Sequence, residues 1–143
     1  MTKIRDVIKD KGPEFIAVDS SAMVDLAISK MVDRNIGAIL VMEEGNLIGM
    51  FTERDVLKCW VDTHESFDKV KIKDVMSKDI MIVQPEDDLN YAMTVMISRK
   101  IRHLPVVENG RVTSVISIRD MVRAQVTNLQ AEVHYLRDYI TGG

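Results

Sequence analysis

The stretch GMFTERDVLK, residues 49–58, returns 65 positions later as SVISIRDMVR, residues 114–123. The same offset holds without a gap over most of the chain, and many of the paired positions carry identical residues. Examples are Val18 and Val83, Ala27 and Ala92, Met31 and Met96, Val41 and Val106, and Gly45 and Gly110. Self-similarity at one fixed offset indicates that a structural unit is repeated. The chain is therefore predicted to contain one unit twice.

In each copy a β-prone run ends at a hydroxyl residue, Thr52 or Ser117, and an aspartate follows three positions later, Asp55 or Asp120. This pattern is typical of a helix that begins directly after a strand. In one interpretation the hydroxyl and the carboxylate only cap the helix. In the other, N–H groups at the helix start bind a phosphate and the carboxylate accepts the hydroxyls of a ribose. Capping is the commoner use of a single pattern, but two copies in register favour a ligand.

Hydrophobic periodicity predicts the order β-α-β-β-α in each copy, preceded by a short helical turn. In the first copy, strands are expected at 15–18, 39–42 and 47–51, helices at 22–34 and 52–61, and a turn with a helix cap at 19–21. In the second copy, strands are expected at 81–83, 104–107 and 112–116, and helices at 89–100 and after 117. The predicted division is repeat 1 at 1–61, a polar linker at 62–71, repeat 2 at 72–126 and a C-terminal helix extension at 127–143. The 143-residue chain has the size of one ordinary domain, so we expect both copies to pack as one α/β (α+β) body.

Composition and charge limit the possible partners. The chain is 46% hydrophobic and 29% charged, with a formal net charge of -3 and dispersed basic residues, which argues against nucleic acid as a partner. No apolar run approaches the roughly 18 residues of a membrane-spanning helix, so no membrane association is expected. Cys59 is the single cysteine, and it is more simply a buried apolar residue than a reactive thiol. A reducing cytoplasm is the expected location.

Patterns for catalysis or metal binding are not found in the sequence. His64, His103 and His134 are isolated from one another and from the single cysteine. Neither a catalytic serine, histidine and aspartate order nor the paired histidines of a zinc-binding helix occurs. We therefore expect neither an enzyme nor a metal site.

The motifs resemble those of a tandem pair of cystathionine-β-synthase (CBS) domains over nearly the whole chain. The family pattern is glycine, a hydrophobic residue, any residue, threonine or serine, two further residues, and aspartate or asparagine. It is intact at 49–55, whereas Ser114 replaces the glycine in the second copy. The hydrophobic-Pro-Val-Val string before the turn is intact at 104–107, but Leu40 replaces its proline in the first copy. The resemblance implies two β-α-β-β-α repeats that pack with pseudo-twofold symmetry and form a cleft with two nucleotide sites.

The resemblance also implies that each site takes residues from both copies. The first site would combine Thr52 and Asp55 with Met81, Ile82, Val83, Arg102 and His103. The second would combine Ser117 and Asp120 with Ile16, Ala17, Val18, Gly37 and Ala38. The expected ligand contains adenosine, with AMP first and ADP, ATP, NAD(H) and S-adenosylmethionine as further possibilities.

The two implied sites differ where a phosphate would lie. Arg102 and His103 in the second copy correspond to Gly37 and Ala38 in the first. A guanidinium matches phosphate oxygens, and a histidine adds a donor that strengthens on protonation. Arg119, near the start of the last helix, is a further candidate for phosphate contact. The alternative is that Arg102 and Arg119 are solvated surface residues and that His103 is a capping residue beside a strand.

The last predicted helix is longer than the repeat requires. Its apolar positions advance by alternating steps of four and three residues: Val122, Val126, Leu129, Val133, Leu136 and Ile140. This is the spacing of a helix that packs along a seam. We expect a homodimer, since two-fold association is the commonest oligomer symmetry; the alternative is packing of this helix on its own module.

The function that this pattern favours is regulation rather than catalysis. A nucleotide that bridges the two copies would favour one cleft geometry and change a surface offered to another protein, whose identity the sequence does not give. The alternative is an interaction module that dimerises and docks without a ligand, in which Thr52 and Ser117 only cap their helices.

Overall fold

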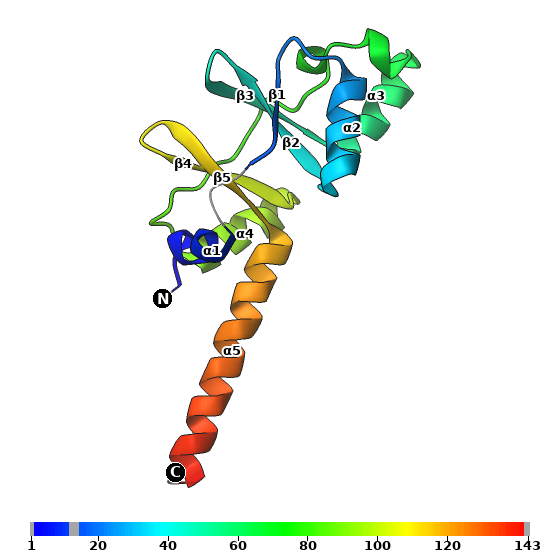
Figure 1. The fold of residues 1–143 in the computed structure, drawn as a ribbon. Helices are drawn as coiled ribbons and strands as arrows, with labels where there is room; N and C mark the ends of the chain where they lie inside the picture. The colour runs from blue at the N-terminus through cyan, green and yellow to red at the C-terminus, as the bar shows by residue number, and fades with distance from the viewer. Residues whose placement is uncertain (1, 12–14, 142–143) are drawn as a thin grey trace.

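The computed structural model describes residues 2–11 and 15–141, coloured from the N- to the C-terminus in Figure 1. The first copy contains β1 (Ala17–Asp19), α2 (Val24–Arg34), β2 (Ala38–Glu43), β3 (Asn46–Thr52) and α3 (Glu53–Thr63). The second contains α4 (Leu89–Arg99), β4 (His103–Glu108), β5 (Arg111–Ser117) and α5 (Ile118–Thr141). The helix α1 (Ile4–Lys11) precedes the first copy, and two short 3-10 helices, η1 (Phe67–Lys69) and η2 (Ile72–Asp74), join the copies. The predicted α/β fold of two repeats is confirmed.

The two sheets keep the offset of the sequence repeat. In the first sheet β1 runs parallel to β2, which is antiparallel to β3, and Ala38 pairs with Thr52. In the second sheet β4 is antiparallel to β5, and His103 pairs with Ser117. Each hairpin has a register shift at equivalent points, after Val41 and after Val106. The repeat in sequence is therefore a repeat in backbone pairing.

The strand predicted at 81–83 is wrong, because only Val83 pairs with β4, as an isolated parallel bridge to Val106. The first copy shows the reason. There the Leu40 N–H donates to the Ile16 carbonyl at 3.2 Å. The equivalent residue in the second copy is Pro105, which has no N–H to donate. One missing ladder bond thus leaves a bridge where the first copy has a strand.

The helix cap predicted at 19–21 is also wrong. α2 begins after Met23, which has no side-chain capping bond, and Asp19 instead accepts from the Ser21 N–H at 2.9 Å within the turn. The Val24 N–H at the start of α2 donates to the Val70 carbonyl at 2.8 Å. Backbone from the segment between the copies therefore satisfies a helix end that a side chain would otherwise cap.

The segment that precedes each copy in the chain packs against the other copy. α1 packs on the second copy, where Ile4 and Val7 join its core, and the Ile4 N–H donates to the Asp87 carbonyl at 2.9 Å. Val70 and Ile72 join the core of the first copy, although they precede the second in the chain. Each repeat is thus completed by the segment that precedes the other one, and the predicted linker at 62–71 packs in part against repeat 1.

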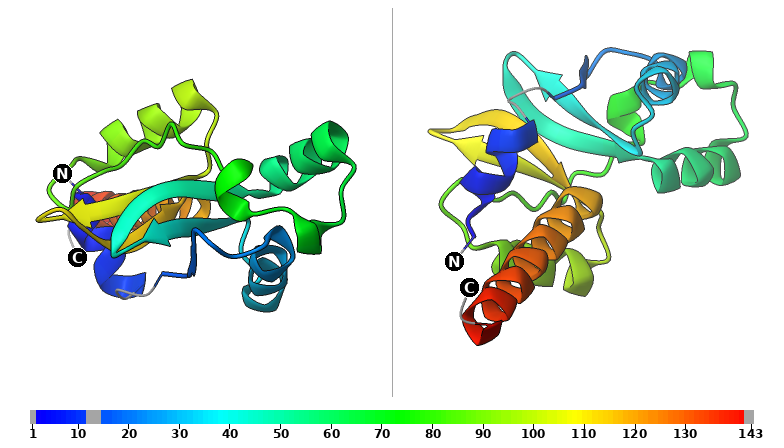
Figure 2. Two further views of the ribbon diagram at one scale, coloured as in Figure 1. Left: turned by 90° about the horizontal axis from the view of Figure 1, so that it is seen from above. Right: turned by 60° about the horizontal axis from the view of Figure 1, so that its bottom comes forward.

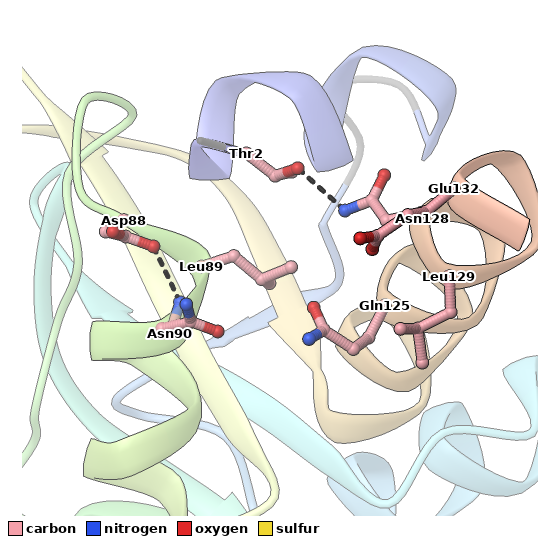
Figure 3. Close-up of a pocket in the computed structure, with 8 residues that line it drawn as sticks. All are labelled: Thr2, Asp88, Leu89, Asn90, Gln125, Asn128, Leu129 and Glu132. Atoms are coloured by element: carbon pink, nitrogen blue, oxygen red, sulfur yellow. Dashed lines mark hydrogen bonds between the residues drawn. The ribbon is translucent and has the colours of Figure 1, made fainter. Parts of the chain in front are cut away.

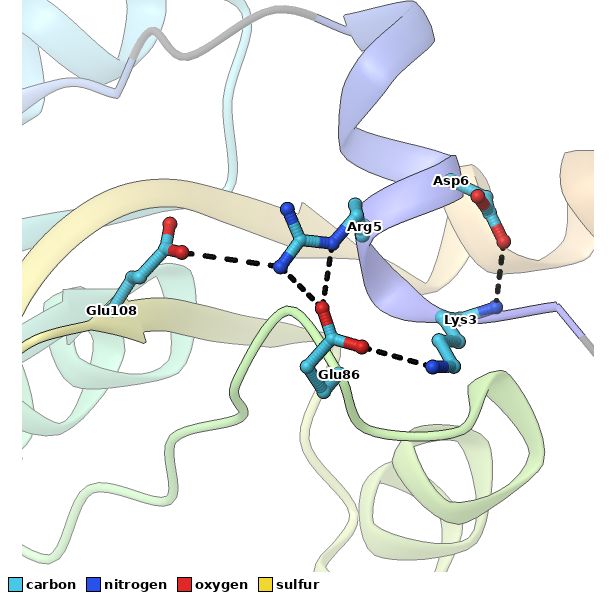
Figure 4. Close-up of polar contacts among 5 residues, drawn as sticks. All are labelled: Lys3, Arg5, Asp6, Glu86 and Glu108. Atoms are coloured by element: carbon cyan, nitrogen blue, oxygen red, sulfur yellow. Dashed lines mark hydrogen bonds and ion pairs between the residues drawn. The ribbon is translucent and has the colours of Figure 1, made fainter.

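Exposed polar contacts also hold α1 against the second copy. Glu86 accepts from Lys3 Nζ at 2.9 Å and pairs with Arg5, as Figure 4 shows. These bonds lower the pKa of the Glu86 carboxyl, with Lys3 contributing most. Arg5 also reaches Glu108 at 3.9 Å. Because these pairs are exposed, they orient α1 more than they stabilise it.

The two copies meet through their sheets. A separate apolar cluster contains Ala38, Leu40 and Met50 from the first sheet, and Val112 and Val115 from the second pack against it. α2 and α3 lie at one end of the molecule and α1 and α4 at the other, with both hairpins between them (Figures 1 and 2). The starts of β2, β4, α3 and α5 carry most of the residues implied for the nucleotide sites.

α5 leaves the body of the molecule and continues alone, as Figure 1 and the right-hand view of Figure 2 show. Met121, near its start, is fully buried, whereas all side chains from Val126 to Ile140 are exposed. Residues 142 and 143 of the predicted C-terminal extension lie outside the described residues. Among the helices described, none combines the length and the apolar character needed to cross a membrane.

Candidate functional site

Both hydroxyl and aspartate patterns form complete capping boxes. In the first copy the Thr52 N–H donates to Asp55 Oδ2 at 3.0 Å, and the Asp55 N–H donates to Thr52 Oγ1 at 3.3 Å. In the second copy the Ser117 N–H donates to Asp120 Oδ2 at 2.9 Å, and the Asp120 N–H donates to Ser117 Oγ at 3.1 Å. The capping interpretation therefore describes the local geometry in both copies.

Each carboxylate also accepts from a second segment of the chain. In the first copy Ser77 Oγ lies 3.0 Å from both carboxylate oxygens of Asp55. In the second copy Lys11 Nζ lies 2.7 Å from Asp120 Oδ2. A capping box uses one backbone donor per carboxylate, so both aspartates accept more than capping requires. Ribose hydroxyls are donors of the same kind.

The donors Ser77 and Lys11 occupy equivalent places. The Ser77 N–H donates to the Met50 carbonyl at 2.8 Å, and Lys11 Nζ donates to the Val115 carbonyl at 2.6 Å. Met50 and Val115 are related by the repeat offset. The sequence did not point to either donor, because both lie in the exchanged lead-in segments, whose placement is a tertiary property.

The second carboxylate is electrostatically stabilised. Burial alone would raise the pKa of Asp120, but the hydrogen bonds from the Lys11 ammonium and the Ser117 N–H outweigh it and hold the pKa below its ordinary value. Asp120 is therefore ionised at neutral pH, as an acceptor of ribose hydroxyls would need to be. The first carboxylate, on Asp55, is only 7% exposed.

The start of β2 in the first copy meets the start of β4 in the second at Gly37. A Cβ atom on Gly37 would lie 3.2 Å from Glu53 Oε1 and 3.5 Å from His103 Cε1. Gly37 therefore lets the two copies approach one another beside the starts of α3 and β4. The structure thus brings together Gly37, implied for the second site, and His103, implied for the first. Glu53 was not predicted, although it follows Thr52 directly.

His103 is held in its neutral form. Burial lowers the pKa of the imidazole below its ordinary value, and Lys11 and Arg102 act in the same direction. Glu53 and Asp120 oppose this effect, but they do not outweigh it. A phosphate beside His103 would favour protonation, so this side chain can respond to the charge of a ligand.

The two arginines proposed for phosphate contact point to solvent. Arg102 and Arg119 are exposed, and neither forms an ion pair with a described carboxylate. The Arg102 carbonyl accepts from the Ile118 N–H at 2.8 Å, which places Arg102 next to the start of α5. Arg102 thus lies beside the second helix start with its charge available to an anion.

Most of the apolar residues implied for the two sites are part of the cores. Val18 and Val83 are 3% and 1% exposed, Ala38 is 8% exposed, and Ile16, Ala17 and Met81 pack against buried clusters. Ile82 differs, because 42% of it is exposed. Ile82 is therefore the most exposed of these residues, and the others would act through their backbone or their edges.

A cavity of about 230 Å³ lies elsewhere, between the N-terminal segment, α4 and α5. Its lining is Thr2, Asp88, Leu89, Asn90, Gln125, Asn128, Leu129 and Glu132, as drawn in Figure 3. Asn128 Nδ2 donates to Thr2 Oγ1 at 2.7 Å across it. None of these residues belongs to the predicted sites. Within 2–11 and 15–141, no group of three or more potential ligand side chains could hold a metal ion.

Comparisons with known proteins match both copies. The model of the CBS domain family matches residues 4–62 and 72–127. The chain is 33% identical to the CBS domain-containing protein CBSX3, mitochondrial, of Arabidopsis thaliana, over 99% of this chain and 73% of that protein. It is 27% identical to the CBS domain-containing protein YhcV of Bacillus subtilis (strain 168), over 92% of this chain and 91% of that protein. The crystal structure of the CBS-domain containing protein ATU1752 from Agrobacterium tumefaciens has a TM-score of 0.83 at 30% identity, over 87% of this chain and 99% of that one.

Proposed function

Since this chain belongs to the CBS domain family, we propose that it is a regulatory module that binds an adenosine nucleotide between its two copies. The observation that carries this proposal is the second donor on each capping aspartate. Ser77 and Lys11 occupy acceptor positions on Asp55 and Asp120 that helix capping does not need. The two hydroxyls of a ribose can replace these donors, because hydroxyl groups also donate hydrogen bonds to carboxylate oxygens.

The phosphate is expected beside Arg102 and His103. Arg102 carries an exposed guanidinium, and His103 lies close to Gly37 and Glu53 of the other copy. AMP is the ligand that suits this arrangement best, because one phosphate matches one arginine fork and one histidine donor. ADP, ATP, NAD(H) and S-adenosylmethionine carry the same adenosine and are the competitors to test.

The proposed mechanism is a shift between cleft geometries. Asp120 lies in the first turn of α5, so a ligand that displaces Lys11 acts directly on the start of the longest helix. The same ligand would contact residues of the other copy, and it would therefore favour one relative placement of the two sheets. The readout would be a changed surface for a regulated protein partner, without catalysis by this chain.

Two experiments test the proposal. Purified protein is denatured, and the supernatant is analysed by absorbance at 260 nm and by mass spectrometry for an adenosine compound. Protein freed of ligand is then titrated with AMP in a calorimeter, with Arg102→Ala compared against Arg111→Ala, an exposed arginine at the far end of the same hairpin.

The proposal expects an adenosine compound in the supernatant, or AMP binding that Arg102→Ala weakens and Arg111→Ala does not. Absence of binding by AMP, ADP, ATP, NAD(H) and S-adenosylmethionine would instead support a ligand-independent interaction module. The cytoplasm is our proposed location, because the lone Cys59 is buried and unpaired, as in proteins of reducing compartments. The Arabidopsis relative is named as mitochondrial.

A further inference from the structure

Nucleotide binding leaves the exposed apolar stripe of α5 unexplained. We define the α5 stripe as Val122, Val126, Leu129, Val133, Leu136 and Ile140. These side chains are between 46% and 80% exposed, although their spacing is that of a packed seam. The body of the protein contacts Met121, Ala124 and Asn128 of α5, and Leu129 is the stripe residue that also lines the cavity beside the body. We propose that a second copy of this chain covers the α5 stripe by forming a parallel two-stranded coiled coil.

The residue types along the stripe favour two parallel strands. With a and d as the seam positions of a heptad, the a positions are Val126, Val133 and Ile140, all of them β-branched. The two d positions that follow a are Leu129 and Leu136. β-branched residues at a with leucine at d favour parallel dimers over trimers and tetramers. The residue types along the stripe therefore favour one particular assembly, the parallel dimer, over non-specific hydrophobic association.

Charges beside the seam are consistent with the parallel orientation. Glu132 falls at a g position and Arg137 at the e position five residues later. In a parallel dimer the g position of one helix faces the following e position of its partner, so Glu132 of one copy faces Arg137 of the other. Gln125 and Gln130 form the equivalent uncharged pair one heptad earlier. The one charged flanking pair is thus complementary in this register, and the other pair introduces no like-charge repulsion.

The placement of α5 gives a second copy access to the stripe. The helix extends away from the body along most of its length (Figures 1 and 2). Asn128, which reaches Thr2 of the body, occupies a c position, and c positions do not face the partner in a coiled coil. Ala131, at an f position, is exposed and faces away from the seam. In a dimer with a two-fold axis along the seam, the body of each copy therefore lies on the side of its helix that faces away from the partner helix.

Self-association is measured first, by light scattering during size-exclusion chromatography of the full chain at tens of micromolar. The wild type is expected at about twice its 16.2 kDa chain mass. Val133→Glu places two carboxylates at one level of the apolar seam and should weaken association by roughly a hundredfold, leaving the monomer mass. Ala131→Glu adds the same charge on the opposite face and should remain dimeric. Because both residues are exposed in the single chain, circular dichroism should show that both variants stay folded.

Orientation is measured by disulfide formation under mild oxidation. Leu136→Cys should cross-link two copies, because a parallel seam places identical d positions opposite one another, whereas Ala131→Cys should not. The native Cys59 is 2% exposed and should not contribute. A wild-type monomer, a dimer that Val133→Glu leaves intact, or a dimer in which Leu136→Cys cross-links no better than Ala131→Cys would overturn the proposal. None of these outcomes depends on nucleotide binding.

Discussion

Lys11 and Asp120 form an ion pair in which Lys11 Nζ lies 2.7 Å from Asp120 Oδ2. The residues are 109 positions apart, and the pair occupies the place where Ser77 holds Asp55 in the first copy. The two equivalent carboxylates are thus held by different donors, a cation in one case and a neutral hydroxyl in the other. A ribose at Asp120 must displace an ammonium group that forms an ion pair, whereas a ribose at Asp55 displaces an uncharged hydroxyl donor.

Lys11→Met is therefore expected to strengthen adenosine binding at the second site. The change removes the competing ammonium and leaves the Asp120 carboxylate available, so the weaker phase of an adenosine titration should tighten by about tenfold, given the usual strength of a charge-assisted bond. Calorimetry measures this phase. Lys9→Met on the same helix is the control and should leave it unchanged. If both variants behave alike, Lys11 does not compete with the ligand.

Acid should remove the stability that Asp120 contributes. Its pKa in the folded protein lies below the ordinary value of about 3.9, so the folded state favours the ionised carboxylate. That contribution is fully present above pH 5, and it is lost as the pH falls through 3.9 towards the folded-state value. Urea midpoints of the wild type and Asp120→Asn should therefore converge between pH 5 and pH 3. Parallel pH curves for the two proteins would contradict the assignment.

Arg102→Ala should weaken AMP far more than adenosine, because adenosine has no phosphate to lose. A charge-assisted bond to phosphate contributes roughly 1.5 to 3 kcal/mol, which corresponds to about ten- to a hundredfold in affinity. The resemblance pairs Arg102 with Asp55, so Asp55→Ala should remove the tighter phase of an AMP titration and Asp120→Ala should leave it largely intact. Because the Arg102 carbonyl bonds the start of α5, the reverse result would assign the phosphate to the site of Asp120. The phosphate site is misplaced if AMP and adenosine lose affinity equally in Arg102→Ala.

His103 should make AMP binding depend on pH. Burial lowers its pKa in the ligand-free protein, and a bound phosphate would raise it, so binding takes up a proton. Affinity for AMP should therefore rise as the pH falls from 8 towards 6. Calorimetry of His103→Gln corrects for titration of the phosphate itself and should show a flatter profile. Equal profiles for the two proteins would exclude His103 from phosphate contact.

Gly49 and Ser114 occupy equivalent positions but should respond to alanine in opposite ways. A Cβ atom on Gly49 would lie 2.8 Å from Met76 Cγ and closer still to its sulfur, so Gly49→Ala should destabilise the protein by about 1 to 3 kcal/mol. Ser114 is fully buried, and its hydroxyl has no hydrogen-bond partner among the residues the structure describes. Ser114→Ala should therefore leave stability unchanged or raise it by about 1 kcal/mol. Urea unfolding of both variants measures the change in the free energy of unfolding. The prediction is wrong if the two variants change this free energy in the same direction.

The repeat, the order of its elements and its capping boxes were predictable from the sequence. They depend on local features, namely a constant offset, the period of the apolar residues and a hydroxyl three positions before an aspartate. The same local information identified the stripe on α5, because seam spacing belongs to one helix. Where prediction failed, a distant segment intervened. The cap of α2 is replaced by backbone from Val70, and the strand at 81–83 is reduced to a bridge because Pro105 in its partner strand lacks an N–H.

Only the tertiary structure decided which segments meet. Nothing in the sequence near Asp55 or Asp120 names Ser77 or Lys11 as their second donors, since each contact depends on the path of a lead-in segment to the other repeat. The approach of Gly37 to His103 likewise depends on how the two sheets pack. Local sequence determines what each segment can form, because backbone bonding and side-chain periodicity act over a few residues. Contacts between the copies are decided by burial of apolar surface, which is non-directional and selects partners only when the whole chain is assembled.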